Sequence, residues 1–251
     1  AATIQEGERE AGNDEFWGFV WQGNAYEGLT TNALEWHVSE TGDNFLTADG
    51  EILVTSDASI AAYERAASWV DTISPPGVVS YAEEDARGVW HAGNAAFMRN
   101  WPYAYVSSGE SEDIPGFDVA PLPAGSSGTG ASALGGWHIG VSQYSENPDA
   151  AAAFAVYMTS VENQKFYSID TSSPPAALEL YDDPDIQEAM PFASPDIVEI
   201  TTARPSNFAR DQYNAVSTLY FEAVHSILTG EEDADVALEL LELDLIALFE
   251  E

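Results

Sequence analysis

The chain contains no cysteine among its 251 residues. Without thiols it can form no disulfide framework, no thiolate nucleophile and no cysteine zinc site. Histidine is also scarce: His37, His91, His138 and His225 are scattered, and no pair of them has the spacing of metal ligands. We therefore expect neither a bound metal nor a cofactor.

Basic residues are the next shortage. The sequence holds 7 basic and 43 acidic residues, for a formal net charge of −36, and Lys165 is its single lysine. Such a field repels nucleic acid and anionic membranes, so both are disfavoured as partners. At ~1 M salt the screening length falls to ~3 Å and the self-repulsion largely disappears. Because the acids are dispersed along the chain, we interpret them as an adaptation to high salt rather than as an acidic tail.

Long apolar runs are missing as well. No stretch of eighteen apolar residues exists, so no segment is expected to span a membrane. The chain also lacks an N-terminal methionine and a secretory signal peptide, and it opens with a polar, helix-like stretch from Ile4 to Ala11. We therefore expect a mature or trimmed product, or a fragment of a longer protein.

Patterns typical of enzymes are weak or absent. No nucleophile elbow or catalytic triad stands out, and the sequence Gly128-x-Gly130-x-x-Ala133 lacks the strand and helix that flank a dinucleotide fingerprint. Glycoside hydrolysis needs two carboxylates facing one bond. Glu27 and Glu83 could serve, but 43 acidic residues make any such choice unspecific. We expect no catalytic residues and keep a carbohydrate-active enzyme as the alternative.

The most informative segment that is present is Phe97–Tyr105. It places Trp101, Tyr103 and Tyr105 around Pro102 with neither a helical nor a strand period. Pro102 fixes its own φ and biases the residues before it away from helix. Rigid aromatic faces on a loop suit a ligand with flat apolar faces and polar edges, as sugars have. Packing in the core is the alternative; the two are balanced for Tyr105, and ligand contact is favoured for Trp101 and Tyr103.

An arginine stands in a second loop motif, Arg204-Pro205-Ser206. Arginine occurs six times in a chain dominated by acids, so one retained before a helix suggests a specific task. Its planar donor fork could hold hydroxyl oxygens, or it could form a local salt bridge. The residue pattern leaves both open.

Helical and strand patterns alternate along the chain, which predicts the α/β class. The expected strands are 95–98, 117–119 and 137–141, with a hairpin over 44–54. The expected helices are 25–38, one from Asp57, one near 83–90, one starting at Asn147-Pro148-Asp149, one with a capping box at Thr159-x-x-Glu162, one ending at Gly230 and one from about Asp235.

Four motifs combine into a family resemblance. They are W-Q-G-x-x-Y-E-G-L at Trp21–Leu29, R-N-W-P-Y-A-Y at Arg99–Tyr105, L-G-G-W at Leu134–Trp137 and A-R-P-S at Ala203–Ser206. Their order and spacing resemble the trehalose/maltose-binding proteins of ABC sugar importers, in extracellular solute-binding protein family 1, over essentially the whole chain. The acidic composition is similar to that of a haloarchaeal-type member.

The resemblance implies a type II periplasmic-binding-protein fold, in which two α/β lobes close on a sugar. This chain would begin after the segment that builds most of the first lobe in such proteins. Residues 1–135 would be the first part of the C-terminal lobe. Residues 136–189 would be a crossing segment and helices of the incomplete N-terminal lobe, and 190–251 the return helices of the C-terminal lobe.

The resemblance also implies a function: the extracellular sugar-binding component of an ABC transporter. Its partners would be an oligosaccharide and the membrane permease subunits, and we expect a monomer at the cell surface, lipid-anchored through a segment outside this sequence. The alternatives are the carbohydrate-active enzyme and an acidic interaction module without a sugar site. The implied sugar contacts are Trp101, Tyr103, Gly136, Trp137 and Arg204, with Trp21 and Tyr26 as weaker candidates.

Overall fold

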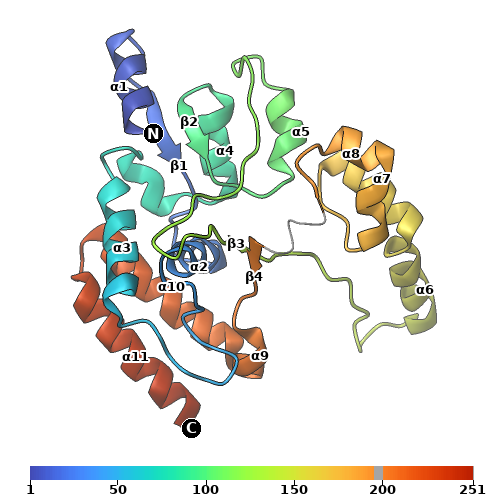
Figure 1. Ribbon diagram of the computed structural model, residues 1–251. Coiled ribbons are helices and arrows are strands. Elements are labelled where there is room, and N and C mark those ends of the chain that lie inside the picture. The colour runs from blue at the N-terminus through green and yellow to red at the C-terminus, as the bar shows by residue number, and fades with distance from the viewer. Residues whose placement is uncertain (195–199, 251) are drawn as a thin grey trace. The chain divides into compact units, whose positions relative to one another are not determined.

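The computed structural model describes residues 1–194 and 200–250 (Figure 1). The chain divides into two compact units. The larger unit comprises Ala1–Asn100, Pro121–Leu134 and Ile200–Glu251, and the smaller unit comprises Trp101–Ala120 and Gly135–Glu199. Residues 101–120 therefore group with 135–199, whereas the sequence analysis assigned them to the first segment of a C-terminal lobe.

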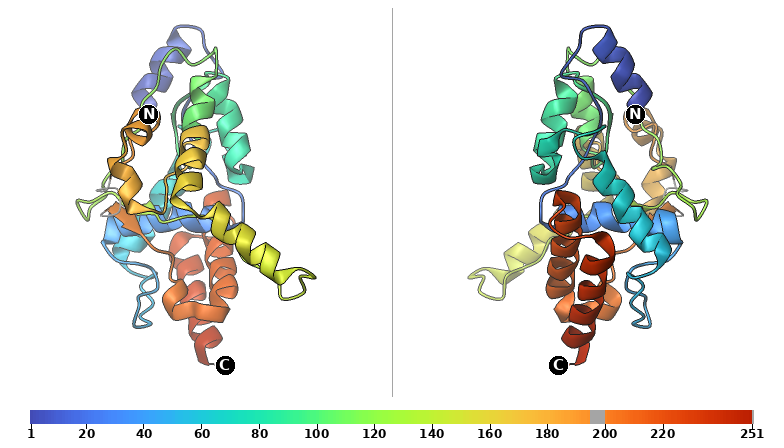
Figure 2. Two further views of the ribbon diagram at one scale, coloured as in Figure 1. Left: turned by 90° about the vertical axis from the view of Figure 1, so that its right-hand side faces the viewer. Right: turned by 90° about the vertical axis from the view of Figure 1, so that its left-hand side faces the viewer.

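The larger unit is built around helix α2, most of whose residues are buried. Helices α3 and α10 pack against it, and α11 packs beside α10, as the two side views show (Figure 2). The elements of this unit are α1 (Ala2–Glu10), β1 (Trp17–Val20), α2 (Glu27–Thr41), α3 (Asp57–Trp69), η1 (Pro76–Ser80), α4 (Glu83–His91), β2 (Ala95–Met98), β3 (Ser132–Ala133), β4 (Thr201–Thr202), α9 (Ser206–Ala209), η4 (Arg210–Gln212), α10 (Tyr213–Thr229) and α11 (Ala234–Glu250).

Two short parallel pairs supply the strands of the larger unit. β1 pairs with β2, with Phe19 opposite Phe97, and β3 pairs with β4, with Ser132 opposite Thr201. Helices α2, α3 and α4 and the short helix η1 all lie between β1 and β2 in the chain, so the connection is long enough for the crossover that a parallel pair requires. The expected α/β class is confirmed, in a helix-rich form.

A cluster of aromatic side chains lies in the otherwise mainly aliphatic core of the larger unit. Trp21 is completely buried, its Nε1 donates to Ser74 Oγ at 3.0 Å, and its ring packs edge-on against Trp36 and Trp69. This corrects the suggestion of Trp21 as a sugar contact, because its indole has no face open to solvent. The W-Q-G-x-x-Y-E-G-L motif begins with a core residue.

A buried ion pair connects α2 to two of the strands. Arg99, which follows β2, donates from Nε to Glu35 Oε2 at 2.9 Å and from Nη2 to Glu35 Oε1 at 2.7 Å. The same Glu35 oxygen accepts the backbone N–H of Ala133 in β3 at 3.0 Å, and Arg99 Nη1 donates to Gln22 Oε1 at 3.1 Å. Arg99 and Ala133 each stand one residue before a unit boundary, so one carboxylate anchors the chain at two of its crossings.

The smaller unit has its own core, formed by Leu180, Tyr181, Ile186, Met190 and Ala193. Lys165 joins two of its helices, because its Nζ lies 2.7 Å from both Asp183 Oδ2 and Asp185 Oδ2. The elements of this unit are α5 (Ala104–Gly109), α6 (Pro148–Met158), α7 (Val161–Thr171), η2 (Leu178–Asp182) and α8 (Pro184–Ala189).

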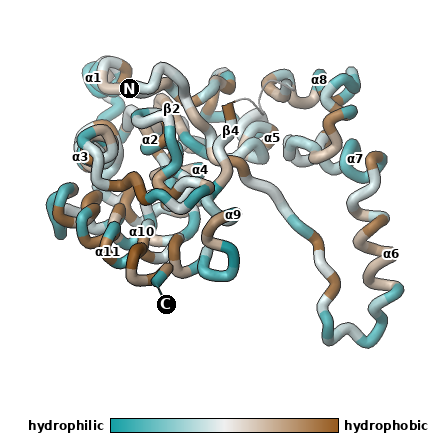
Figure 3. Tube along the Cα trace, turned by 60° about the horizontal axis from the view of Figure 1, so that its bottom comes forward, coloured by the Kyte–Doolittle hydropathy of each residue, from teal (hydrophilic) through white to brown (hydrophobic). Residues whose placement is uncertain are grey.

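Helix α6 has no buried residue. Phe154, Val156 and Tyr157 are all more than half exposed, and the helix shows repeated apolar positions along its length (Figure 3). Pro148 begins this helix as expected, whereas α7 is capped by the Ser160 side chain, which accepts from Asn163 N, instead of by Thr159. The exposed apolar residues of α6 form an uncovered surface of the smaller unit.

Two expected strands are wrong. Residues 117–119 and 137–141 have the right alternation, but neither forms a strand, and Ile139 and Val141 lie exposed. Alternating apolar and polar residues give a segment one apolar face, but a strand also needs a neighbouring strand to pair with its N–H and C=O groups. The expected hairpin over 44–54 forms as a short antiparallel pairing, with a bridge between Leu46 and Ile52 and backbone hydrogen bonds from Thr47 N to Glu51 O at 2.9 Å and from Leu53 N to Phe45 O at 2.8 Å.

Candidate ligand-binding site

The aromatic loop folds as a turn that leads into a short helix. Ala104 N donates to Trp101 O at 3.0 Å and Tyr105 N donates to Pro102 O at 2.9 Å, and Tyr103 precedes the first residue of α5. Pro102 cannot donate a hydrogen bond, so its place at the start of this turn leaves no N–H unpaired. Trp101 and Tyr103 are held here with their side chains half-buried.

The ring of Trp101 lies against the backbone of Gly135. A Cβ at Gly135 would stand 2.9 Å from Trp101 Cζ3, closer than real Cβ atoms approach, so any other residue at this position would require the ring to shift. The structure thus brings Trp101 together with the Leu134–Trp137 motif, which lies more than thirty residues further along the chain. Gly136 is exposed, and Trp137 is 93% exposed.

Of the two alternatives for Tyr105, ligand contact and core packing, the structure shows packing. Its ring centroid lies 5.3 Å from that of Phe117 and 5.0 Å from that of Phe192, within the smaller unit. These distances are typical of aromatic pairs in protein interiors. The loop therefore presents two aromatic side chains, Trp101 and Tyr103, and uses the third to hold itself in place.

Tyr26 stands at the start of α2 in the larger unit. Its hydroxyl donates to Glu83 Oε2 at 2.7 Å, and Asn100 Nδ2 donates to Glu83 O at 3.2 Å, so Tyr26 is connected to the residue before Trp101. A Cβ at Gly28 would lie 2.1 Å from the Tyr26 ring, which explains the second glycine of the W-Q-G-x-x-Y-E-G-L motif. Tyr26 is half-buried, with its hydroxyl engaged inside the protein.

Arg204 forms the local salt bridge that the sequence left open. Its Nη1 lies 2.6 Å from Glu27 Oε1, and the two side chains are 29% and 41% exposed. Glu27 also accepts from the Tyr213 hydroxyl at 2.5 Å and from the Ser217 hydroxyl. A guanidinium has five N–H donors, and the described residues accept from one of those on Arg204.

The predicted site residues thus fall into two groups. Trp101, Tyr103, Gly136 and Trp137 belong to the smaller unit, and Tyr26 and Arg204 belong to the larger. Sequence reasoning missed Gly135, which supports Trp101, although the paired glycines of L-G-G-W could have indicated a close approach. It also missed Tyr213 and Ser217, one helical turn apart on α10, and considered Glu27 only as an acid catalyst.

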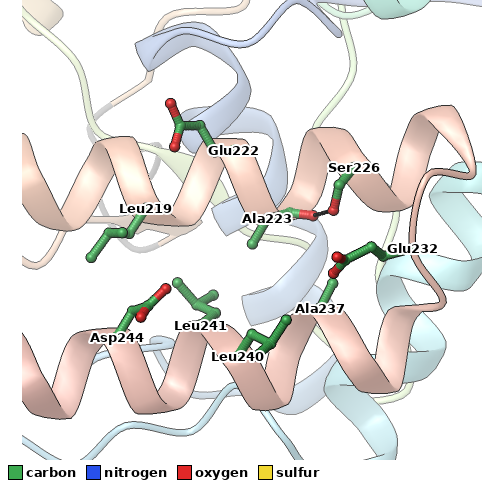
Figure 4. Close-up of a pocket in the computed structure, with 9 residues that line it drawn as sticks. All are labelled: Leu219, Glu222, Ala223, Ser226, Glu232, Ala237, Leu240, Leu241 and Asp244. Atoms are coloured by element: carbon green, nitrogen blue, oxygen red, sulfur yellow. Dashed lines mark hydrogen bonds between the residues drawn. The ribbon is translucent and has the colours of Figure 1, made fainter.

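A cavity of about 140 Å³ lies elsewhere, between α10 and α11 (Figure 4). Three acidic residues, Glu222, Glu232 and Asp244, share its lining with leucine and alanine. No aromatic ring and none of the implied sugar contacts lines it. The described residues contain no group of three or more side chains arranged to hold a metal ion, and none of their helices is long and apolar enough to span a bilayer.

The sequence profile of the bacterial extracellular solute-binding proteins matches residues 9–165 of the chain. A probable ABC transporter-binding protein of Deinococcus radiodurans is 41% identical over 247 residues. That match covers 96% of this chain and 58% of the relative.

Solved structures agree on the fold. Maltose-bound MalE3 of T. maritima is 33% identical, with a TM-score of 0.87 over 97% of this chain and 63% of that one. The GacH receptor of Streptomyces glaucescens, solved unliganded and with acarbose, is 24% identical with a TM-score of 0.80, over 95% of this chain and 60% of that one. The fold is that of type II periplasmic-binding proteins, and the chain spans about three fifths of the length of these relatives.

Proposed function

The chain belongs to the family of bacterial extracellular solute-binding proteins, and on that basis we propose that it is part of the sugar-binding component of an ABC importer. The ligands would be oligosaccharides of the trehalose/maltose type. The observation that carries this proposal is the support of the Trp101 ring by Gly135, beside Gly136 and the exposed Trp137. MalE3, the relative with the higher identity among the two solved structures above, was solved with maltose bound.

Binding would use the two kinds of surface that a pyranose offers. Trp101, Tyr103 and Trp137 would stack on the apolar faces of the rings, and stacking releases poorly held water from both surfaces. The backbone of Gly136 and the open donors of Arg204 would hydrogen-bond hydroxyls at the ring edges. Binding alone breaks no bond, so the proposed component is not an enzyme.

The uncovered surface of α6 fits the expected lobe arrangement. Phe154, Val156 and Tyr157 expose an apolar area that isolated domains rarely leave to solvent. Because the matched relatives are longer than this chain, we propose that further sequence of the full-length protein covers it. Residues 136–189 would then belong to the N-terminal lobe, and 1–135 and 190–251 to the C-terminal lobe, although residues 101–120 group with 135–199 in this structure.

In the assembled importer, closure of the two lobes on the sugar would present a surface to the membrane permease subunits. We propose a monomer outside the cell, attached to the surface by a lipid anchor. The acidic composition would suit a haloarchaeal-type host, because high salt screens the self-repulsion of 36 net negative charges.

No observation favours glycoside hydrolysis over binding. Glu27 is held by Arg204, Tyr213 and Ser217, and Glu83 accepts from Tyr26. Both carboxylates thus take part in contacts between the helices of the larger unit. Incubation of the full-length protein with maltose or trehalose at high salt is expected to leave the disaccharide uncleaved.

The central test is Trp101→Ala in the full-length protein, titrated calorimetrically with maltose and with trehalose in molar salt. Loss of one stacked ring should raise the dissociation constant roughly tenfold or more, since ~1.4 kcal/mol is a factor of ten. The melting temperature should change little, because the ring is half-buried and proposed to face the ligand.

The matched control is Tyr144→Ala, which removes an exposed aromatic of the same unit outside the proposed site. It should leave the affinity unchanged. Unchanged affinity in Trp101→Ala together with a large loss of stability would show that Trp101 is a core residue. Absence of heat with either sugar in the wild-type protein would overturn the assignment of the ligand.

A further inference from the structure

The polar cluster around Glu27 joins three distant parts of the larger unit. Glu27 lies in the first turn of α2, Arg204 lies in the segment between β4 and α9, and Tyr213 and Ser217 lie one turn apart on α10. Arg204 and Tyr213 both donate to Oε1 of Glu27, at 2.6 and 2.5 Å, and the Ser217 hydroxyl donates to Oε2. Both carboxylate oxygens are therefore occupied by fixed donors.

The direction of each hydrogen bond in this cluster can be assigned. An ionised carboxylate only accepts, so the hydroxyls of Tyr213 and Ser217 must donate to Glu27. The Ser217 oxygen is then left as the acceptor in its 2.7 Å contact with Thr30 Oγ1, and Thr30 is buried. Burial and the neighbouring Glu27 raise the pKa of Tyr213, which keeps its phenol protonated as a donor. The carboxylate is thus locked in one orientation.

We propose that Glu27 is a positioning residue, which holds the Arg204 guanidinium so that its remaining N–H donors face the ligand, with Tyr213 and Ser217 locking Glu27 in turn. This inference rests on the proposed function, in which Arg204 binds sugar hydroxyls. A guanidinium on a flexible stem has many orientations, and each must be given up when a ligand binds. An arginine already fixed by its carboxylate loses less freedom on binding.

The exposure of the Arg204–Glu27 pair allows a role of Glu27 in ligand binding to be distinguished from a role in folding stability. Arg204 and Glu27 are 29% and 41% exposed, and ion pairs at this depth contribute little to folding stability. Glu27→Gln keeps the shape of the side chain and removes its charge. It should therefore weaken sugar binding about tenfold while the melting temperature stays close to that of the wild-type protein.

A double-mutant cycle in the full-length protein tests whether Glu27 acts through Arg204. Affinities for maltose and trehalose are measured for wild type, Glu27→Gln, Arg204→Gln and the double variant. Arg204→Gln should also cost about tenfold, and adding Glu27→Gln to it should cost almost nothing more. Glu84→Gln is the matched control, since it removes a carboxylate from an exposed arginine pair of the same unit, and it should leave the affinity unchanged. Two independent tenfold losses that multiply in the double variant would overturn the inference.

A second measurement needs no sugar. Arginine side-chain NMR of the ligand-free protein should show slow rotation of the Arg204 guanidinium in wild type and fast averaging in Glu27→Gln. Unchanged Arg204 signals in Glu27→Gln would refute the holding role. If wild type binds neither sugar, the proposed function fails, whereas the NMR result still decides whether Glu27 immobilises Arg204.

Discussion

Replacement of Arg99 by methionine should destabilise the larger unit more than any exposed charge substitution. The side chains of Arg99 and Glu35 are 6% and 4% exposed, and they meet through two parallel hydrogen bonds of 2.9 and 2.7 Å. Arg99→Met leaves the Glu35 carboxylate buried without its cation. Removal of one partner of a buried pair typically costs about 3–5 kcal/mol of folding free energy, and we expect a loss in that range.

The double variant Arg99→Met/Glu35→Leu measures the change in folding free energy when both partners of the pair are replaced. Apolar replacement of a whole buried pair is often neutral or stabilising by about 1–4 kcal/mol. Here it would also leave the buried Ala133 N–H without its acceptor, which costs about 1–3 kcal/mol, whereas Gln22 Oε1 keeps the Asn32 Nδ2 donor at 3.4 Å. The two effects nearly cancel, which gives a net change of about zero, so the double variant should be more stable than Arg99→Met.

Urea denaturation in molar salt, followed by tryptophan fluorescence, measures both effects. Five of the seven tryptophans lie in the larger unit, so the signal reports mainly on that unit. Arg87→Met is the matched control, because it makes the same charge change at a pair that is 30% and 62% exposed. Its cost should stay within ~1 kcal/mol. If Arg99→Met costs no more than Arg87→Met, the buried pair does not anchor this unit.

Two further predictions concern solution conditions. With a net charge of −36, the fold should lose its cooperative transition on dialysis to millimolar salt and regain it at molar salt; a circular dichroism melt unchanged across the salt series would contradict the high-salt interpretation. Burial lowers the pKa of His37 from 6.5 to about 4, so the unfolded chain binds more protons between these values, and stability falls as the pH drops from about 6.5 to about 4. In this window wild type should lose up to about 3 kcal/mol more than His37→Gln, and a gap between the two that does not change with pH would refute the buried neutral histidine.

The fold was most predictable where one helix supplies its own pattern. The apolar spacing on α10 and the glycine after it are local signals, and the helix ends at Thr229 with Gly230 in the left-handed region, as expected. The strand 95–98 was also predicted at its observed bounds. Residues 137–141 carry the same alternation yet form no strand, because pairing depends on a neighbour that the local sequence does not specify.

In the candidate site, too, features set by the local sequence were predictable and contacts between distant residues were not. Proline and clustered aromatics predicted a loop at Trp101, which the structure confirms. A tryptophan in a motif does not state which way it faces, however, and Trp21 is fully buried because Trp36 and Trp69 surround it. Gly135 and Trp101 meet across more than thirty residues, which no local pattern records.

The scarcity of basic residues predicted the role of each one less well than its structural surroundings do. In a chain with 43 acids, almost any cation finds a carboxylate, and the described residues pair five of the seven. What distinguishes these pairs is their depth and their other partners. Arg99 is buried and hydrogen-bonded on two sides, so its role is structural. Arg204 is partly exposed, donates one N–H to an acceptor among the described residues, and faces a carboxylate that two hydroxyls hold. Under the proposed function, this combination would let Arg204 offer further donors to a hydroxyl-rich ligand.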